Sequence, residues 1–128
     1  MSGALHAIVN PAAGGGRAGR RASSALAELA RRGVALQVVQ TEVPKHATAL
    51  AKQAAERGVR RFLSVGGDGT ASEVVNGLAM ASVSSESELA MLPLGTGNSF
   101  LRDFGIADVE SAVRAITRGE SRPIDVLR

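Results

Sequence analysis

The residues best suited to chemistry are Gly66-Gly67-Asp68-Gly69-Thr70, which follow an apolar run and precede a helical pattern. Glycine lets the backbone approach a ligand closely and adopt positive φ. The amide groups of such a turn, at the start of a helix, form a binding site for phosphate. The Asp68 carboxylate could hold magnesium through water or orient a triphosphate through hydrogen bonds. The alternative is a tight turn that binds nothing.

Thr70 and Glu73 allow a second interpretation of this turn. The spacing Thr-x-x-Glu is that of a capping box, in which each side chain bonds the backbone amide of the other residue. For Glu73 this explanation is at least as good as contact with a ligand. Thr70 could serve both purposes, with its amide or hydroxyl on a phosphate.

Another glycine-rich turn comes earlier in the chain, at Asn10-Pro11-Ala12-Ala13-Gly14-Gly15-Gly16. It lacks the Lys-Ser/Thr ending of a P-loop and the glycine spacing of a dinucleotide fingerprint. Asn10 could read the edge of a base or ribose, and the alternative is a flexible linker. Arg17, Arg20 and Arg21 follow this turn. A phosphate clamp is one interpretation, but for Arg20 and Arg21 a solvated helix face is the better one.

A third turn, Pro93-Leu94-Gly95-Thr96-Gly97-Asn98, again follows an apolar run. Thr96 could donate to a phosphate or a base. Capping of the following helix explains Asn98 equally well, because asparagine is strongly favoured at that position. Thr41 lies just past a further apolar run, where it either contacts the same ligand or starts a local side-chain turn.

Short apolar runs alternate with helical patterns, and each turn joins a run to a helix. The predicted strands are residues 5–10, 34–40, 60–65, 88–94 and 122–127. The predicted helices lie at 17–32, 47–55 (with His46 first), 71–79, 99–103 and 109–116 (capped by Asp108). This alternation implies parallel strands with right-handed crossovers. We therefore expect an α/β fold: a three-layer, open, mostly parallel sheet with helices on both faces and the turns gathered on one edge.

Composition limits the alternatives. The 128 residues fit one domain, and only three are aromatic, so alanine and valine must supply much of the core packing. A net charge of +3 selects no partner, but with so few rings to stack on bases we expect no nucleic acid ligand. There is no cysteine, and the two histidines lack metal-ligand spacing, so we expect no zinc. Neither a signal peptide nor a membrane-spanning run is visible, and the predicted location is the cytoplasm.

In this order, the three turns resemble the diacylglycerol kinase catalytic domain, a family that includes bacterial lipid kinases, sphingosine kinases and ceramide kinases. The resemblance starts at Ile8-Val9-Asn10-Pro11 and covers essentially the whole chain. Its most specific part is Gly66 to Gly77 (GGDGTASEVVNG), and its last part is Pro93 to Phe100 (PLGTGNSF). The bare Gly-Gly-Asp-Gly is shared with NAD kinases and phosphofructokinases, whose N-terminal domains have a fold of the expected kind.

The resemblance implies ATP-dependent phosphorylation of a lipid hydroxyl, with magnesium accompanying the ATP. Asp68 matches a residue that the family needs for activity. Two positions depart from the family pattern, because Lys45 stands where glycine often precedes the histidine and Ser99 where many members have aspartate. The resemblance places ATP against residues of all the turns: Asn10, Pro11, Gly14, Thr41, Gly66, Gly67, Asp68, Gly69, Thr70, Glu73, Gly95, Thr96 and Asn98.

Family members carry a second, mostly β domain that supplies the lipid cleft and the proposed general base. We expect residues 1–128 to be the nucleotide-binding N-terminal domain without it. Because a kinase must hold its acceptor in line with the γ-phosphate, weak or absent lipid phosphorylation is expected from these residues alone. A lipid acceptor would bring the protein transiently to the membrane periphery. Uncovered apolar surface near Ile124, Val126 and Leu127 would favour a homodimer.

Two other functions stay open at this point. One is a non-catalytic nucleotide-binding or regulatory module that kept the same half-site. The other is an enzyme related to NAD kinases or sugar kinases. The Asn-Pro turn and Gly95-Thr96-Gly97-Asn98 argue against this second possibility.

Overall fold

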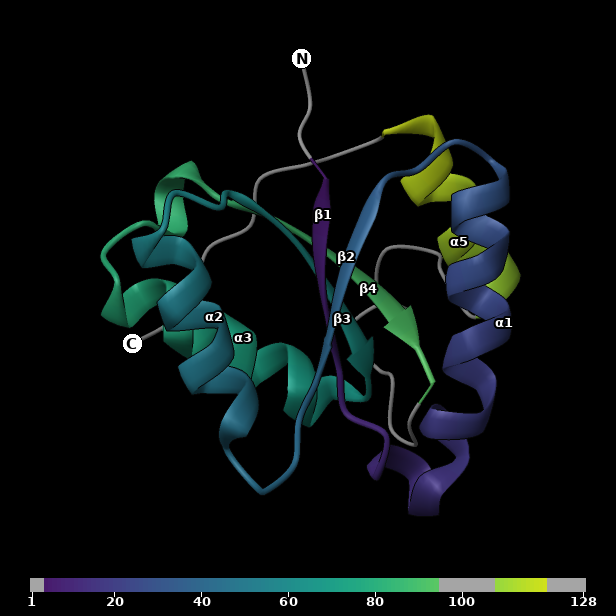
Figure 1. The fold of residues 1–128 in the computed structure, drawn as a ribbon, viewed down its shortest axis with the longest axis horizontal. Coiled ribbons are helices and arrows are strands. Elements are labelled where there is room, and N and C mark those ends of the chain that lie inside the picture. The colour runs from purple at the N-terminus through teal and green to yellow at the C-terminus, as the bar shows by residue number, and fades with distance from the viewer. Residues whose placement is uncertain (1–3, 95–107, 120–128) are drawn as a thin grey trace.

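The computed structural model describes residues 4–94 and 108–119, and within them a single parallel sheet has the strand order β2-β1-β3-β4. All four strands run downward in Figure 1, so their carboxyl ends meet at the lower edge of the sheet. We call this the carboxyl edge. The strands are β1 (Leu5–Val9), β2 (Leu36–Gln40), β3 (Arg61–Gly66) and β4 (Glu88–Pro93).

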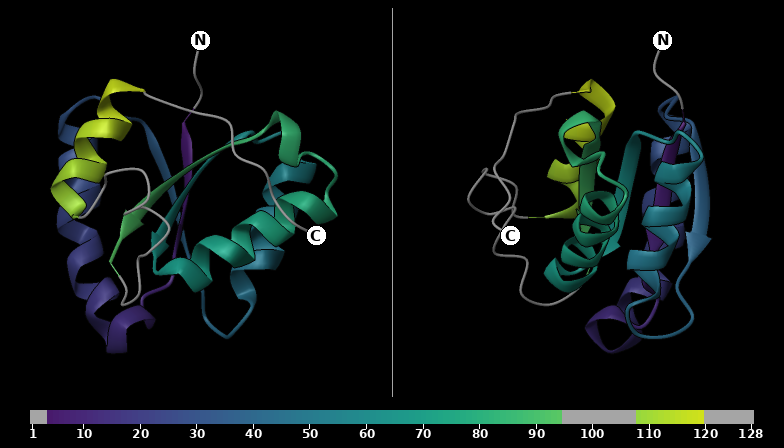
Figure 2. Two further views of the ribbon diagram at one scale, coloured as in Figure 1. Left: turned by 180° about the vertical axis from the view of Figure 1, so that it is seen from behind. Right: turned by 90° about the vertical axis from the view of Figure 1, so that its left-hand side faces the viewer.

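Helices cover both faces of the sheet, α1 and α5 on one side and α2 and α3 on the other (Figures 1 and 2). The predicted three-layer α/β architecture is confirmed. None of the helices in the described parts of the chain has the length and apolarity needed to cross a bilayer. The helices are α1 (Arg17–Arg31), α2 (His46–Glu56), α3 (Asp68–Met80) and α5 (Val109–Arg118), with short 3-10 turns η1 (Ala13–Gly16) and η2 (Ser84–Glu86).

Alternation along β1 divides the core into two layers. Leu5, Ala7 and Val9 pack with the buried residues of α1 and α5, whereas Ile8 packs with those of α2 and α3. Every buried residue that α2 contributes is an alanine, which lets this helix approach its neighbours closely. The predicted core of small side chains is therefore present.

The chain changes direction at the carboxyl ends of β1 and β3. From β1 it passes over one face through α1 to β2, and from β3 it passes over the other face through α3 to β4. Neighbouring strands whose connections diverge in this way form a topological switch point, where open α/β sheets bind their ligands. The topology therefore selects the turns after β1 and β3 as the place to look for a site.

Two predicted helix starts, those of α2 and α5, are confirmed. α2 begins at His46, and the Ser111 amide donates to Asp108 Oδ1 over 2.8 Å at the start of α5, as predicted. That backbone hydrogen bond, with one from the Ser111 side chain, lowers the pKa of Asp108. Four predictions lie outside the described residues: the helix at 99–103, the strand at 122–127, the Gly95-Thr96-Gly97-Asn98 turn, and the apolar surface at Ile124, Val126 and Leu127.

Candidate functional site

The carboxamide of Asn10 joins three strand ends at the carboxyl edge. Its Nδ2 donates to Thr70 Oγ1 over 3.3 Å, and its Oδ1 accepts from Thr41 Oγ1 over 3.3 Å. The Asn10 backbone amide also donates to the Val65 carbonyl of β3 over 2.9 Å. Asn10, Thr41 and Thr70, which the sequence predicts for one site, therefore lie together although 60 residues separate the first from the last.

The turn between β3 and α3 is shaped by Gly66. A Cβ added there would lie 2.5 Å from Thr70 Oγ1 and 3.1 Å from Thr70 Cβ, so no side chain fits without moving Thr70. Gly69 is different, because a Cβ added there meets nothing within 4 Å. The first turn of α3 thus has packed backbone on one side and open space on the other, as close approach of a ligand requires.

The capping-box interpretation of Thr70 and Glu73, left open by the sequence, does not apply. α3 begins at Asp68 with Gly67 as its N-cap, and no side chain caps it. Thr70 is therefore the third residue of the helix rather than its cap, and its hydroxyl bonds Asn10 instead. Glu73 lies in the second turn, half-buried, where its backbone carbonyl accepts from Thr48 Oγ1 over 2.9 Å. No side chain among the described residues therefore caps the α3 N-terminus.

The glycine-rich turn after β1 folds against the β3–α3 turn. Gly14, Gly15 and Gly16 have φ of 61°, 68° and 93°, a left-handed run that residues with a Cβ rarely adopt. Ala13 Cβ would lie 3.5 Å from a Cβ at Gly66, so the two turns are neighbours. Like α3, α1 has no side-chain cap: it begins at Arg17 with Gly16 as its N-cap. The positive ends of two helix dipoles therefore lie at the carboxyl edge.

Pro11 holds the glycine-rich turn to α1. Its carbonyl accepts from the Gly19 amide over 3.2 Å, and a Cβ at Gly19 would lie 3.1 Å from Pro11 Cβ. Pro11 is predicted from the sequence as a ligand contact, whereas the contact at Gly19 is not predicted. The only signal for Gly19 was a glycine inside an otherwise helical pattern, which a packing contact often explains.

The loop after β2 brings Thr41 back to Asn10. The Glu42 amide donates to His46 Nδ1 over 2.9 Å, which closes this loop onto the start of α2. Lys45 has φ of 67°, the left-handed conformation that favours glycine. Lys45, which departs from the family pattern, therefore has a backbone conformation that glycine adopts more easily.

The donors at the carboxyl edge fit a phosphate group. Neither helix N-terminus at this edge has a side-chain cap, although the Arg17 and Gly19 amides of α1 already donate to backbone carbonyls. Glycines at the first turn of α3 and in η1 leave the backbone accessible. A dedicated metal cluster is not found in the described parts of the chain, since no three His, Asp or Glu side chains gather there.

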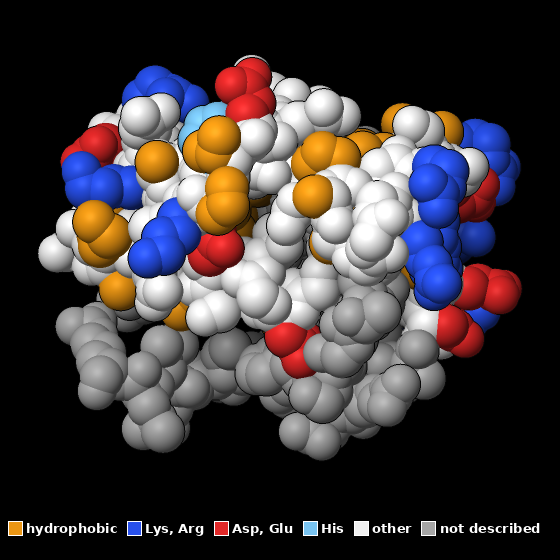
Figure 3. Space-filling view, turned by 90° about the horizontal axis from the view of Figure 1, so that it is seen from below, with side chains coloured by type: hydrophobic (Ala, Val, Ile, Leu, Met, Phe, Trp, Pro, Cys, Tyr) orange, Lys and Arg blue, Asp and Glu red, His pale blue; other side chains and the backbone are white. Residues whose placement is uncertain are grey.

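An open groove of about 610 Å³ lies elsewhere, between α1 and α5. Arg20, Arg21, Ser24 and Arg32 line it, together with Glu28 and Glu110, and none of the predicted site residues does. The carboxyl edge is seen from below in Figure 3, where uncharged polar side chains and backbone occupy much of the centre and Lys and Arg gather at the right, over α1. The predicted site and the groove are therefore separate features.

Comparison with known proteins agrees with this geometry. The model of the family described as "Diacylglycerol kinase catalytic domain" matches residues 4–128. The diacylglycerol kinase of Bacillus subtilis is 35% identical over 121 residues, which is 93% of this chain and 39% of that protein. The diacylglycerol kinase of Staphylococcus aureus strain MRSA252 is 33% identical over 120 residues, 93% of this chain and 38% of that protein.

Solved structures show the same relationship. The crystal structure of a diacylglycerol kinase from Bacillus anthracis has a TM-score of 0.79 at 31% identity, over 94% of this chain and 44% of that one. The chain thus spans about two fifths of the length of these relatives. Since the family model matches nearly all of its residues, the chain belongs to the diacylglycerol kinase catalytic domain family.

Proposed function

We propose that the carboxyl edge binds the phosphates of ATP, and that the protein to which this edge belongs transfers the γ-phosphoryl group to a lipid hydroxyl. One observation carries the nucleotide half of the proposal. The Asn10 carboxamide links the ends of β1 and β2 to α3, beside two helix N-termini that have no side-chain cap. The lipid half rests on the names of the relatives, which are diacylglycerol kinases.

Each residue type at the edge has a distinct role in the proposal. The amides of the α3 first turn and of the Gly14 loop donate to phosphate oxygens. Asp68 is the proposed catalytic residue and orients the triphosphate. Magnesium, when bound with ATP, neutralises phosphate charge during transfer. The remaining proposed contacts to ATP are Pro11, Gly66, Gly67, Gly69, Thr70, Glu73, Gly95, Thr96 and Asn98.

Asn10 and Thr41 form the frame of the proposed site. The Asn10 oxygen already accepts from Thr41 Oγ1 and from the Ala12 amide over 3.1 Å, and its nitrogen is engaged with Thr70. Because its carboxamide is already engaged in these bonds, Asn10 is better suited to holding the turns together than to recognising a base. We therefore propose that Asn10 supports ATP affinity chiefly by positioning the turns.

Calorimetric titration with ATP and magnesium tests the nucleotide half. We expect saturable binding by the wild type and a loss of about tenfold in affinity for Asn10→Ala, because the turns lose their common partner. Asp68→Asn should weaken binding in the presence of magnesium more than in its absence. Gln53→Ala is the matched control, since it removes an exposed carboxamide from α2. No detectable binding by the wild type would refute the proposal.

Because residues 1–128 alone are expected to transfer little or no phosphate, the acceptor is tested on the protein to which this edge belongs, by following transfer of the γ-phosphoryl group from ATP to dispersed diacylglycerol and, in parallel, to NAD. Transfer to the lipid supports the proposal. Transfer to NAD alone would instead support the NAD-kinase-like alternative. Tight ATP binding without transfer to any acceptor would favour a regulatory module.

A further inference from the structure

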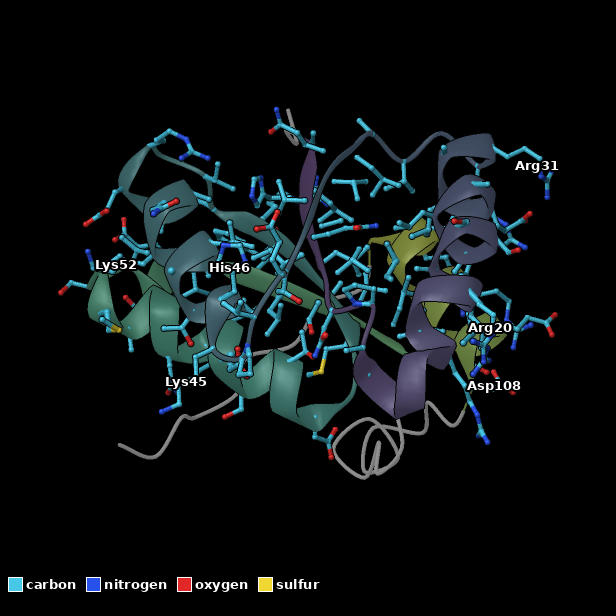
Figure 4. The ribbon with its side chains drawn as sticks, turned by 60° about the horizontal axis from the view of Figure 1, so that its bottom comes forward. Arg20, Arg31, Lys45, His46, Lys52 and Asp108 are labelled. Carbon is cyan, nitrogen blue, oxygen red and sulfur yellow. The ribbon has the colours of Figure 1, made fainter. Side chains whose placement is uncertain are left out.

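Strand β2 forms one edge of the sheet. Among the described residues it pairs with β1 alone, and every residue of it is exposed or only half-buried. In Figure 4 it passes between α2, which begins at His46, and α1, which carries Arg20 and Arg31, and the right-hand view of Figure 2 shows it as the outermost strand. No described element therefore covers its outer side.

The hydrogen bonds to β1 show which backbone groups of β2 lack a partner in the sheet. At one end the Ala35 carbonyl accepts from β1 over 2.9 Å, and at the other the Thr41 amide donates to β1 over 2.8 Å. Backbone groups alternate between the two sides of a strand, so every second residue from Ala35 to Thr41 faces β1. The N–H and C=O groups that point outward are consequently those of Leu36, Val38 and Gln40.

This edge has none of the features by which natural proteins prevent an edge strand from pairing, which are charged side chains, proline and bulges. The segment from Val34 to Thr41 (VALQVVQT) contains neither a charged residue nor a proline, and its register with β1 is unbroken. Val38, in the middle of the strand, is 47% exposed. The outer side of β2 is therefore suited to pairing with another strand.

The edge is complementary to a second copy of itself. In an antiparallel pair with a twofold axis at Val38, this residue faces its own copy and Leu36 faces Gln40 of the partner subunit. Each such pair exchanges two N–H···O=C bonds, so all the outward backbone groups of β2 gain a partner. No like charges oppose one another along the paired segment, because Glu42, the first charged residue after β2, faces Val34.

We propose that β2 is a self-association surface, which pairs antiparallel with β2 of a second copy and joins two four-stranded sheets into one. A single pair of short strands gives a small interface, so we expect a weak dimer with a dissociation constant on the order of 10–100 μM. The surface is distinct from the apolar one expected near Ile124, and the proposal does not rest on nucleotide binding.

Sedimentation velocity at a series of concentrations tests the dimer. The wild-type chain should pass from monomer to dimer between about 1 μM and about 1 mM. Val38→Lys should weaken association by about tenfold or more, because it places two like charges opposite one another at the centre of the pairing. Met80→Lys is the matched control, since it adds the same charge at an exposed apolar residue of α3, and it should change association by less than about twofold.

A second variant tests the backbone rather than the side chain. Val38→Pro removes an outward N–H without removing a bond to β1, a position at which an edge strand tolerates proline. It should weaken association by about tenfold while the circular dichroism spectrum stays that of the wild type.

Amide hydrogen exchange tests the register. At a total concentration of about ten times the dissociation constant, only about a fifth of the chains are monomeric. Exchange at Leu36, Val38 and Gln40 should therefore slow by about fivefold relative to dilute protein. Gln37 and Val39 face β1 in monomer and dimer alike, so their exchange should not change.

A chain that stays monomeric at about 1 mM would overturn the proposal and would favour a different partner for the edge. Equal association of the wild type and Val38→Lys, or of the wild type and a folded Val38→Pro, would also overturn it. A dimer that forms without slower exchange at the outward amides would place the interface on another surface. None of these results depends on ATP, so this proposal can fail while the proposed nucleotide site stands.

Discussion

The carboxyl edge and the contact between α2 and α3 both depend on a glycine, but for opposite reasons. At Gly77 an added Cβ would meet the Thr48 carbonyl oxygen, and would lie 2.8 Å from Ala51 Cβ and 3.0 Å from the Lys52 amide nitrogen. At Gly66 the nearest atom is instead a side-chain hydroxyl, that of Thr70. Gly77 allows the backbone of α2 to lie against α3, whereas Gly66 shapes the turn between β3 and α3.

The difference shows which region is packed and which is open. Between α2 and α3, backbone atoms already fill the space that a side chain would need, so no ligand can enter there. At the carboxyl edge Gly69 lies only three positions after Gly66, and a Cβ added at Gly69 meets nothing within 4 Å. Gly66 and Gly77 stand at the two ends of one sequence motif, but only the first half of that motif, at the β3–α3 turn, is open to a ligand.

The largest effect is expected from Gly77→Ala. Because the obstructing atoms include backbone of α2, the helices must move apart, and we expect a loss of about 2–3 kcal/mol in the free energy of unfolding. Urea unfolding followed by circular dichroism measures it. Gly69→Ala is the matched control, with no stability loss but weaker ATP binding. Equal stability of the two variants would remove the distinction between packed and open glycines.

Gly66→Ala should cost less, about 1–2 kcal/mol, because the obstructing Thr70 hydroxyl can turn away. Turning it breaks the hydrogen bond to Asn10, so ATP affinity should fall as well. Adding Thr70→Ala removes the obstructing oxygen and should recover part of the stability but not the ATP affinity. A double-mutant cycle measures this coupling, and additive losses in stability would show that Gly66 does not act through Thr70.

Acidification should weaken the packed side of the sheet. His6 is only 4% exposed, it packs edge-to-face on Phe62, and its Nδ1 has no hydrogen-bond partner. Burial, and then the charge of Arg57, lower its pKa below 6.5 in the folded state. The unfolded chain therefore binds the proton more readily, so stability is greatest above pH 6.5 and falls as the pH drops below that value.

Unfolding by urea at a series of pH values measures this dependence. The decline in stability below the unfolded pKa should be smaller in His6→Leu, which has no imidazole to protonate at this position. An identical decline in this variant and in the wild type would assign the pH dependence to other groups.

The smallest effect is expected from Lys45→Gly, at the N-cap of α2, between the carboxyl edge and the contact of α2 with α3. Glycine adopts φ of 67° without the steric cost that lysine has there, so stability should rise by roughly 0.5 kcal/mol. Thermal unfolding measures the change. A loss of stability would show that the lysine side chain contributes more to this loop than its backbone strain costs.

Much of the framework is predictable from local patterns. Strands and helices alternate regularly, and in a parallel sheet the turns after the strands must share an edge. This reasoning places Asn10, Thr41 and Thr70 in one site before their contacts are known. The start of α2 at His46 and the N-cap of α5 at Asp108 are also predicted, because helix starts depend on residues close in sequence.

Contacts between distant segments were not predictable in the same way. The bonds from Asn10 to Thr41 and Thr70 cross 31 and 60 residues, so their partners could not be chosen from spacing alone. The role of Gly77 depends on where Thr48 lies on another helix. The capping box failed because α3 starts two residues before Thr70, a shift that a Thr-x-x-Glu pattern does not reveal.

The central claim is that ATP phosphates bind at the open turn after β3 and leave the packed helix pair unchanged. Amide chemical shifts during titration with ATP and magnesium test it most directly. We predict saturable shifts at Asn10, Thr41, the η1 glycines and Gly66 to Thr70, with little change around Gly77. Saturable shifts confined to the groove between α1 and α5, or none at the β3–α3 turn, would contradict the account.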